Sequence, residues 1–349
     1  MIGNPIKVLV VEDSPVVQQL LTHVIDSDPR LRVVGVADNA AQAVRLIRLL
    51  GPDVVTMDIR LPQMNGFEAT RWIMREHPVP IVVVASNVDD ASLDISMNAL
   101  RAGALSVVSK PAGVRMADYE GMAAQLCTQL VIMSEVRVVR QRPTRHGVPP
   151  PVTHLPAAVR MVGLVASTGG PGAIARILGN LPPGFGAPVA VVQHMGAQFM
   201  GGFTHWLGTV SALPVSLAAD GQPACPGRVY VAPGDSHLTV VEGVLVLRDG
   251  PPVQGLRPSG DVLFDSLAHH HGDTAVGVLL TGMGEDGARG LADLRQAGGH
   301  TIAEDRSTAV IWGMPGAAVA LGAAVEVLPV DAIALRLSQL VAARPGGGA

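Results

Sequence analysis

The sequence predicts an α/β protein in which two parallel-sheet domains follow one another along the chain. Short apolar runs alternate with helix-length amphipathic segments in the first third of the chain, a pattern typical of parallel sheets covered by helices. A stretch rich in arginine and proline then interrupts this pattern, which resumes at Met161. A length of 349 residues is enough for two domains at ~150 residues each. We therefore expect one domain over residues 5–130, a linker over 131–157 and a second domain over 158–345.

The first predicted domain contains apolar runs of strand length, rich in valine and isoleucine. Such runs are typical of the central strands of a parallel sheet, which are buried on both faces. Helix-length segments separate the runs, so we expect a five-stranded parallel sheet with helices on both faces. The predicted strands are residues 6–11, 31–37, 54–57, 81–84 and 106–108, and the first two predicted helices are residues 15–28 and 40–50.

A change of composition separates the two predicted domains. Four arginines stand between Arg137 and Arg145, and Pro149, Pro150 and Pro151 follow them. Sequence of this kind buries little apolar area and favours an extended, semi-rigid chain. We therefore interpret it as a linker whose charges are solvated.

The second predicted domain has three central apolar runs, residues 161–166, 189–192 and 275–280. Their near-continuous apolar character is typical of strands in a parallel sheet. Residues 228–232 predict a further strand, and two short runs within residues 238–247 predict a hairpin. We expect a doubly wound, mostly parallel α/β sheet.

The composition excludes several classes of function. The chain has 25 Lys+Arg against 29 Asp+Glu, a formal net charge of −4, so it lacks the overall basic character that nucleic-acid binding favours. Lysine occurs only as Lys7 and Lys110, which excludes a P-loop lysine and a pyridoxal Schiff base from the second domain. Cys127 and Cys225 show neither a zinc spacing nor a disulfide framework, which indicates a reducing compartment.

The sequence also gives no sign of export or of membrane insertion. Its N-terminus runs directly into a strand-like segment with acidic residues, unlike a signal peptide. Prolines, glycines and polar residues interrupt every apolar stretch before it reaches the ~20 residues of a membrane helix. We therefore expect a soluble, cytoplasmic protein with no nucleic-acid partner and no segment inserted in a membrane.

Charged side chains follow three strands of the first predicted sheet. Glu12 and Asp13 come after the first strand, Asp58 after the third and Lys110 after the fifth. The carboxyl ends of parallel strands meet at one edge of the sheet, where ligands collect. Carboxylates gathered there suit Mg²⁺, and a lysine offsets the charge of a phosphoryl group. Ordinary polar loop residues would explain one of these positions, but not all four in register.

Four motifs follow one another along this domain, VLVVEDS, TMDIRLPQMNG, VVVASN and SKP. In order and spacing they resemble the receiver domain of two-component response regulators over residues 5–130. The resemblance implies a flavodoxin-like (CheY-like) fold. It implies that Asp58 is the phosphoacceptor, and that Glu12 and Asp13 hold Mg²⁺ together with Asp58. It also implies that Lys110 contacts the phosphoryl group.

Receiver domains also carry a switch serine or threonine after the fourth strand. Ser86 is the best match in this chain, although counting from Pro80 places Ala85 at that position. We assign the switch to Ser86 and keep Ala85 as the alternative.

Three polar elements follow predicted strands of the second domain, each among glycines. They contain Ser167, His194 and Asp286. A serine becomes a nucleophile when an imidazole accepts its proton, and a carboxylate orients that imidazole. Residues at the ends of neighbouring strands can meet in this way. Alternatively, the Ser-Thr-Gly-Gly turn is a helix N-cap or a phosphate-binding turn, and the histidine is a strand-end residue with a structural role.

A second set of motifs covers the rest of the chain, namely VGLVASTGGPGA, VQHM, VYVAPGDSHL, RPSGDVLFDSLA, LLTGMGEDGARGL and TIAEDRSTAVIWGMPGAA. Together with the receiver, they resemble the CheB family of chemotaxis methylesterases. The resemblance implies that Ser167 is the nucleophile, His194 the general base and Asp286 the residue that orients it. Thr168 lies beside the nucleophile, and the Met283 backbone N–H is a candidate oxyanion donor.

The resemblance also implies an activity and its partners. We expect a phosphorylation-regulated hydrolase that demethylates glutamate methyl esters, and deamidates glutamines, on methyl-accepting chemotaxis receptors. Phosphorylation of the receiver by a chemotaxis histidine kinase would release inhibition of the esterase. The expected cofactor is Mg²⁺ for receiver phosphorylation, with none for the ester chemistry, and the expected state is a monomer.

Several other histidines have simpler interpretations. His269, His270 and His271 precede Gly272, which is typical of a helix C-terminus rather than a metal site. Three further histidines are expected at the surface or in loops, and they are His205, His237 and His300.

Two rival hypotheses belong to other classes of function. One is a receiver joined to a non-catalytic output domain, although no terminal helix-turn-helix pattern supports DNA binding. The other is a dinucleotide-dependent enzyme built on the Ser-Thr-Gly-Gly turn, although the chain lacks a Gly-x-Gly-x-x-Gly sequence.

Overall fold

The chain forms two compact units, Met1–Pro143 and Thr144–Ala349. The computed structural model describes residues 4–62, 64, 66–85, 104, 106–110, 116–136 and 159–342. The predicted switch residue Ser86 and most of the predicted linker therefore lie outside the described residues. The domain boundaries at 130/131 and 157/158 stay predictions.

A five-stranded parallel sheet forms the centre of the first unit, as predicted. The strands lie in the order β2-β1-β3-β4-β5, and every pairing between them is parallel. Their valines and isoleucines are buried because helices cover both faces. The strands are β1 (Ile6–Val11), β2 (Leu31–Ala37), β3 (Val54–Asp58), β4 (Ile81–Ala85) and β5 (Ser106–Ser109).

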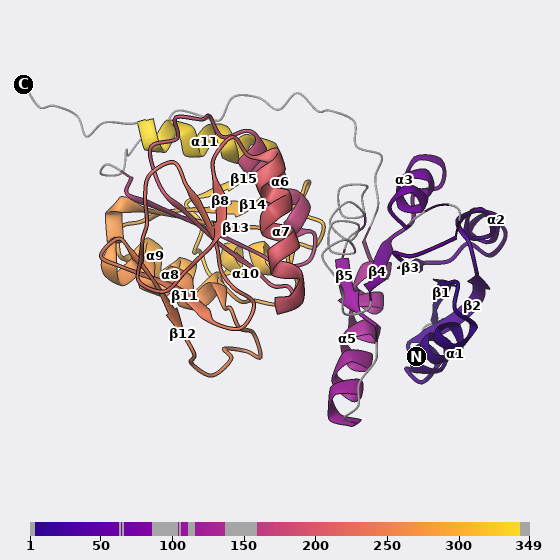
Figure 1. Ribbon diagram of the computed structural model, residues 1–349. Coiled ribbons are helices and arrows are strands. Elements are labelled where there is room, and N and C mark those ends of the chain that lie inside the picture. The colour runs from indigo at the N-terminus through magenta and orange to yellow at the C-terminus, as the bar shows by residue number, and fades with distance from the viewer. Residues whose placement is uncertain are drawn as a thin grey trace, which may run out of the picture. The chain divides into compact units, whose positions relative to one another are not determined.

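The described helices of this unit form two pairs, one on each side of the sheet (Figure 1). Helix α1 contacts α5, and α2 contacts α3. Local sequence explains the limits of α2, because the Asn39 side chain accepts a hydrogen bond from the Gln42 N–H and Gly51 ends the helix at φ 55°. The helices are α1 (Pro15–Asp26), α2 (Ala40–Leu50), α3 (Gly66–Glu76) and α5 (Met116–Ser134).

A seven-stranded parallel sheet forms the centre of the second unit. Its strands lie in the order β15-β14-β13-β6-β7-β10-β8. A separate antiparallel sheet, β11-β12-β9, contains the predicted hairpin. The main-sheet strands are β6 (Met161–Ala166), β7 (Val189–Gln193), β8 (Val215–Leu217), β10 (Val229–Val231), β13 (Ala275–Leu279), β14 (His300–Glu304) and β15 (Glu326–Leu328). The others are β9 (Gln222–Pro223), β11 (His237–Val241) and β12 (Val244–Arg248).

Helices cover both faces of the seven-stranded sheet, so the predicted doubly wound α/β architecture is confirmed (Figure 1). Helix α6 contacts α7 and α11 on one face, and α9 contacts α8 and α10 on the other. The helices are α6 (Gly170–Gly179), α7 (Ala197–Val210), α8 (Gly260–His270), the 3₁₀ turn η1 (Gly272–Thr274), α9 (Ala288–Gln296), α10 (Met314–Ala320) and α11 (Val330–Ala342). Within the part of the chain that the structure describes, no helix combines the length and apolar character needed to cross a membrane.

Glycines let helix α8 approach the sheet closely, through the ring of Phe264. A Cβ added at Gly163 of β6 or at Gly277 of β13 would lie 3.2 Å from Phe264 Cε1. A Cβ added at Gly290 of α9 would lie 2.9 Å from Phe264 Cβ. The buried Phe264 therefore fills space that these glycines leave open, which lets α8 pack closely against β6, β13 and α9.

Candidate functional site

Three neighbouring strands of the seven-stranded sheet end at the predicted catalytic residues. Ser167 follows β6, His194 follows β7, and Asp286 lies in the loop between β13 and α9. Strand β6 lies between the other two in the sheet, with β7 on one side and β13 on the other. The chain thus reverses its direction of winding at β6, and such switch points create a crevice at the carboxyl ends of the strands.

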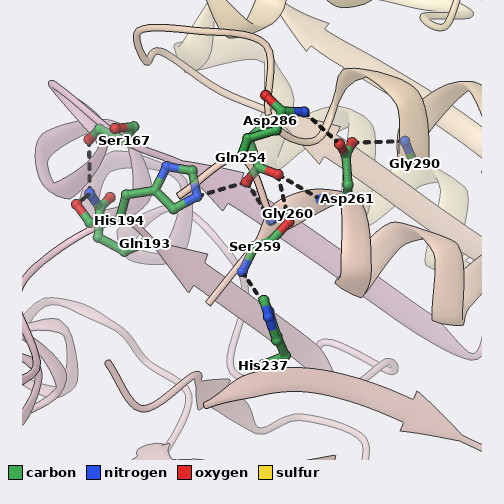
Figure 2. A network of polar contacts seen from close by, with 10 residues as sticks. All are labelled: Ser167, Gln193, His194, His237, Gln254, Ser259, Gly260, Asp261, Asp286 and Gly290. Atoms are coloured by element: carbon green, nitrogen blue, oxygen red, sulfur yellow. Dashed lines mark hydrogen bonds and ion pairs between the residues drawn. The ribbon is translucent and has the colours of Figure 1, made fainter. Parts of the chain in front are cut away.

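His194 and Asp286 are joined directly. His194 Nε2 lies 2.8 Å from Asp286 Oδ2. With Nε2 facing the Asp286 carboxylate, Nδ1 is the ring nitrogen left to act as a base towards Ser167. Figure 2 shows the imidazole lying between Ser167 and Asp286. The adjacent Glu285 is exposed, whereas Asp286 is 1% exposed, so the structure distinguishes the two acids of this loop.

The Asp286 carboxylate is held by the start of α8. The Ser259 hydroxyl donates to Oδ1 at 2.6 Å, and the Gly260 N–H donates to Oδ2 at 2.6 Å. The Asp261 N–H adds a bond to Oδ1 at 3.2 Å. Burial opposes the charged form, but the bonds from His194, Ser259 and Gly260 outweigh it and hold the pKa of Asp286 below its usual range. Asp286 is therefore a buried, ionised carboxylate aimed at His194.

The backbone around Ser167 is fixed by its neighbours. The Ser167 N–H donates to the Thr281 carbonyl at 3.0 Å, and Gln193 Nε2 donates to the Ser167 carbonyl at 2.8 Å. Gly169 turns the chain into α6 at φ 77°, where an added Cβ would lie 2.5 Å from Val310 Cβ. In Figure 2 the dashed line from Ser167 runs to Gln193, and none joins Ser167 to His194. Hydrogen bonds between a nucleophile and its base are often long without substrate.

Two backbone N–H groups beside Ser167 are free of backbone partners. Within the described residues, neither the Thr168 N–H nor the Met283 N–H donates to a backbone carbonyl. The Thr281 hydroxyl donates to the Thr168 carbonyl at 2.9 Å, which ties the loop of Met283 to the turn of Ser167. The Met283 side chain is 50% exposed. These two N–H groups are therefore candidate donors to the oxygen of a bound carbonyl compound.

A buried acid supports the same loop from beneath. Glu304, at the end of β14, accepts from the Thr281 N–H at 2.8 Å and from the Thr308 hydroxyl at 3.0 Å. Burial raises the pKa of Glu304 to about 7, against the opposing effect of these two hydrogen bonds. Glu304 is not distinguished by the sequence alone, because its signal, one acid at the end of a strand, is shared by many structural residues.

The polar residues of the first unit also meet at the strand ends, as predicted. Lys110 Nζ lies 2.6 Å from Glu12 Oε2 and 3.0 Å from Asp58 Oδ1. Glu12 and Asp58 are buried and Asp13 is exposed. Burial raises the pKa of Glu12, the hydrogen bond from Lys110 opposes that rise, and the nearby Asp58 adds to it. One lysine therefore does not fully compensate the carboxylates at this edge.

This arrangement fits a divalent cation. One oxygen from each of Glu12, Asp13 and Asp58 lies within 4.8 Å of the others. Mg²⁺ takes carboxylate oxygens at ~2.0–2.1 Å, and a metal between two or three carboxylates keeps waters as its remaining ligands. The fit rests on these donors together with the incompletely compensated negative charge around them.

Two predicted histidine environments are wrong. His237 is buried in β11, where its ring bonds the Ser259 N–H and the Pro251 carbonyl. His300 is buried in β14 with its Nε2 2.8 Å from Glu326 Oε1. Both lie on strands that bury their side chains against a neighbouring element, and a single histidine gives no such signal in a sequence.

The other histidines agree with their predictions. His205 is exposed on α7. His269 and His270 occupy the last turn of α8, His271 is its C-cap, and Gly272 follows at φ 48°.

Comparison with known proteins identifies both units. The family model described as a response regulator receiver domain matches residues 8–117, and the model described as CheB methylesterase matches residues 162–337. A protein-glutamate methylesterase/protein-glutamine glutaminase of Paramagnetospirillum magneticum is 50% identical over 96% of this chain and 97% of its own length. The chain belongs to the CheB methylesterase family. A second relative with the same description, from Myxococcus xanthus, is 44% identical over the whole of both chains.

A solved structure supports the fold of the second unit. The CheB methylesterase catalytic domain of Thermotoga maritima matches with a TM-score of 0.51 and 38% identity. The match covers 53% of this chain and all of that domain. The two predicted family resemblances are therefore confirmed, together with the α/β fold class.

Proposed function

We propose that this chain is a phosphorylation-regulated protein-glutamate methylesterase and protein-glutamine glutaminase of a chemosensory pathway. It removes methyl groups from glutamate methyl esters on methyl-accepting chemotaxis receptors and thereby serves adaptation. The observation that carries the proposal is the 2.8 Å contact of His194 with Asp286 at the strand ends beside Ser167, in a chain of the CheB methylesterase family. Relatives that cover almost the whole chain bear both activities in their names.

Ester hydrolysis begins with Ser167 as the nucleophile. Its oxygen attacks the ester carbonyl carbon while Nδ1 of His194 accepts the hydroxyl proton. The bond to the methoxy oxygen then breaks, and that oxygen takes the proton from His194 and leaves as methanol. Water attacks the acyl-enzyme in the same way, passing a proton through His194 back to Ser167 and releasing the glutamate side chain. Asp286 stabilises the imidazolium in both steps.

The same residues account for the glutaminase activity. The Ser167 oxygen attacks the amide carbon of a glutamine side chain, and His194 gives its proton to the departing nitrogen, which leaves as ammonia. Both substrates then share one acyl-enzyme and one product, a glutamate side chain.

Stabilisation of the tetrahedral intermediate falls to the backbone. The N–H groups of Thr168 and Met283 donate to the oxygen that becomes negative when the carbonyl is attacked. Their support comes from the Thr281 hydroxyl, which bonds the Thr168 carbonyl at 2.9 Å.

The receiver domain controls this chemistry. Asp58 accepts a phosphoryl group from a chemotaxis histidine kinase, and Lys110 contacts the transferred group. Glu12, Asp13 and Asp58 would hold Mg²⁺, which when bound would neutralise the charge of the carboxylates and the phosphate. Ser86 is the switch residue, and phosphorylation releases inhibition of the esterase.

The remaining parts of the proposal concern organisation. The receiver covers residues 5–130, the linker 131–157 and the catalytic domain 158–345. The protein acts in the cytoplasm as a monomer, where it meets the receptor substrate and the kinase.

Methanol release from methylated receptor membranes tests the proposal. Wild-type chain with Mg²⁺ and a phosphodonor should release methanol, and Ser167→Ala should release none while Asp58 is still phosphorylated. The intact phosphorylation of that variant serves as the control for folding of the receiver. Methanol release by Ser167→Ala at the wild-type rate would contradict the assignment.

A further inference from the structure

Helix α8 has a serine at its N-cap that does not cap the helix. Ser259 has extended backbone angles, φ −111° and ψ 139°, and its side chain makes no capping bond. A serine in this position usually accepts a bond from the second or third N–H of its own helix. Here the carboxylate of Asp286 accepts from the Gly260 and Asp261 N–H groups instead. The serine hydroxyl is thereby free to donate to the same carboxylate, at 2.6 Å.

Ser259 is itself held from behind by a histidine. The Ser259 N–H donates to Nδ1 of His237 at 3.2 Å, and His237 Nε2 lies 3.1 Å from the Pro251 carbonyl oxygen. The Ser259 N–H is a donor and the Pro251 carbonyl is an acceptor, so these partners suit an imidazole that carries its proton on Nε2. Ser259 is 0% exposed and His237 is 3% exposed. Figure 2 shows the resulting series from His237 through Ser259 and Asp286 to His194.

We propose that Ser259 is a positioning residue for ester hydrolysis. Ser259 keeps the Asp286 carboxylate aimed at His194, and His237 holds Ser259 in place. This inference rests on the proposed function, because it assigns Ser259 a role only through the relay of Ser167, His194 and Asp286. The carboxylate has two oxygens, and Oδ2 is occupied by His194 and Gly260. Oδ1 accepts from the Ser259 hydroxyl and from the Asp261 N–H, and the hydroxyl is the closer donor. The hydroxyl therefore fixes the rotation of the carboxylate about the bond that joins it to the rest of the side chain.

The serine also contributes charge stabilisation. A short bond from a hydroxyl to a carboxylate is stronger than a neutral one. Without it, Oδ1 keeps only the Asp261 N–H at 3.2 Å. The carboxylate would then rotate more freely and hold the His194 imidazolium less well.

Helix α8 offers a matched control in Ser266. This serine is also buried, and its hydroxyl donates to the Leu263 carbonyl at 2.7 Å and accepts from the Val240 N–H at 3.0 Å. It therefore loses comparable bonds on replacement by alanine. These two partners belong to α8 and β11, not to the relay of Ser167, His194 and Asp286.

The experiment compares Ser259→Ala and Ser266→Ala in the full chain, by methanol release and by proton NMR. The Ser259 hydroxyl bonds a charged carboxylate, so losing part of this bond in the transition state should lower kcat of Ser259→Ala about tenfold, with KM within about twofold. The downfield resonance of the proton between His194 and Asp286, identified by its loss in Asp286→Asn, should shift. Ser266→Ala should keep both the wild-type kcat and the wild-type resonance.

Two results would overturn the inference. One is a kcat of Ser259→Ala within about twofold of the wild type. The other is an equal loss in Ser266→Ala, which would mean a general effect of helix stability. If Ser259→Ala does not fold, the isosteric Ser259→Cys decides, because its thiol is a weaker donor of similar shape. A wild-type kcat in that variant counts against Ser259.

His237 is tested by coupling. His237→Phe keeps a ring but offers no acceptor to the Ser259 N–H, so it should lower kcat in the same direction as Ser259→Ala. The double variant should be no slower than the slower single variant, because both changes act through one contact. Multiplied losses would show that His237 acts independently of Ser259.

The proposed function and this inference fail in different ways. Ser167→Ala in the same assay tests the relay itself. Methanol release by Ser167→Ala contradicts the proposed function. Loss of release in Ser167→Ala, combined with wild-type kcat in Ser259→Ala, contradicts the role of Ser259 alone.

Discussion

Glu304 accepts a hydrogen bond from the Thr281 backbone N–H at 2.8 Å, and this bond joins the end of β14 to the end of β13. Thr281 in turn accepts from the Ser167 N–H through its carbonyl oxygen. An acid without any contact to Ser167 thus supports the turn on which Ser167 lies. Its burial raises its pKa to about 7, so its charge changes close to neutral pH.

The stability of the second unit should fall as the pH rises from about 4.5 to about 7. Over this range Glu304 is protonated in the folded chain and ionised in the unfolded chain, so the folded state binds more protons and loses stability with rising pH. A difference of this size corresponds to roughly 3 kcal/mol. Glu304→Gln should lack this decrease, because its amide does not titrate.

Denaturant unfolding at pH 5 and pH 8 checks this expectation. Trp312 is a suitable fluorescent reporter because its Nε1–H donates to the Glu304 carbonyl at 3.2 Å. Glu285→Gln, the same change at an exposed position, is the control and should follow the wild type. A pH-independent difference between Glu304→Gln and the wild type would contradict the prediction.

Asp286→Asn should nearly abolish methanol release. The amide carries no charge to stabilise the His194 imidazolium and can present an N–H to it instead of an acceptor. Loss of the acid in such a relay costs up to ~10⁴-fold in kcat. Steady-state kinetics check this, and Glu285→Gln is again the control, since the neighbouring acid is exposed. A kcat close to the wild type would remove Asp286 from the relay.

Gly260→Ala should damage both stability and activity. An added Cβ would lie 2.3 Å from Val165 Cγ1 and 3.2 Å from Asp286 Oδ2. Such overpacking costs ~1–3 kcal/mol and would displace the carboxylate. Gly208→Ala in α7 is the opposite case, because nothing lies within 4 Å of its added Cβ, and it should stabilise the chain by ~0.5–1 kcal/mol. Thermal melts and methanol release of both variants check the pair. Equal melting temperatures of the two variants would refute the steric argument.

Removal of Mg²⁺ should affect phosphorylation of the first unit but not the basal esterase activity of the second unit. Chelation should prevent phosphorylation of Asp58, because Glu12, Asp13 and Asp58 would lose the charge compensation that phosphoryl transfer needs. Methanol release without phosphodonor should stay unchanged. Asp13→Asn should raise the Mg²⁺ concentration needed for half-maximal phosphorylation, which a metal titration measures. An equal phosphorylation yield with and without the chelator would contradict the metal site.

The central strands were predictable from the sequence because strands that are buried on both faces consist of nearly continuous apolar residues. Strand β1 and strand β2 have the predicted limits. Strands β14 and β15 were not predicted, since β14 mixes polar side chains with apolar ones and β15 is short. Such strands depend on pairing with a neighbour, which local sequence does not record.

The site was predictable where chemistry requires particular residue types. Glu12, Asp58 and Lys110 converge as expected, and so do His194 and Asp286. The supporting residues Ser259 and His237 were not predictable. A serine before a helix is usually an ordinary N-cap, and a single histidine has no typical sequence pattern. The contacts of Ser259 and His237 form only in the folded structure, where β11, α8 and the Asp286 loop lie together.

The capping of α8 by Asp286 makes one carboxylate responsible for two tasks. If the first turn of α8 opens, the Gly260 and Asp261 N–H groups leave the carboxylate, and the proposed relay should lose its alignment at the same moment. Hydrogen exchange at these two amides therefore measures the fraction of time in which the acid is in place. The exchange rates of the Gly260 and Asp261 amide protons thus report how often the Asp286 side chain is correctly placed, although Asp286 belongs to a different segment of the chain.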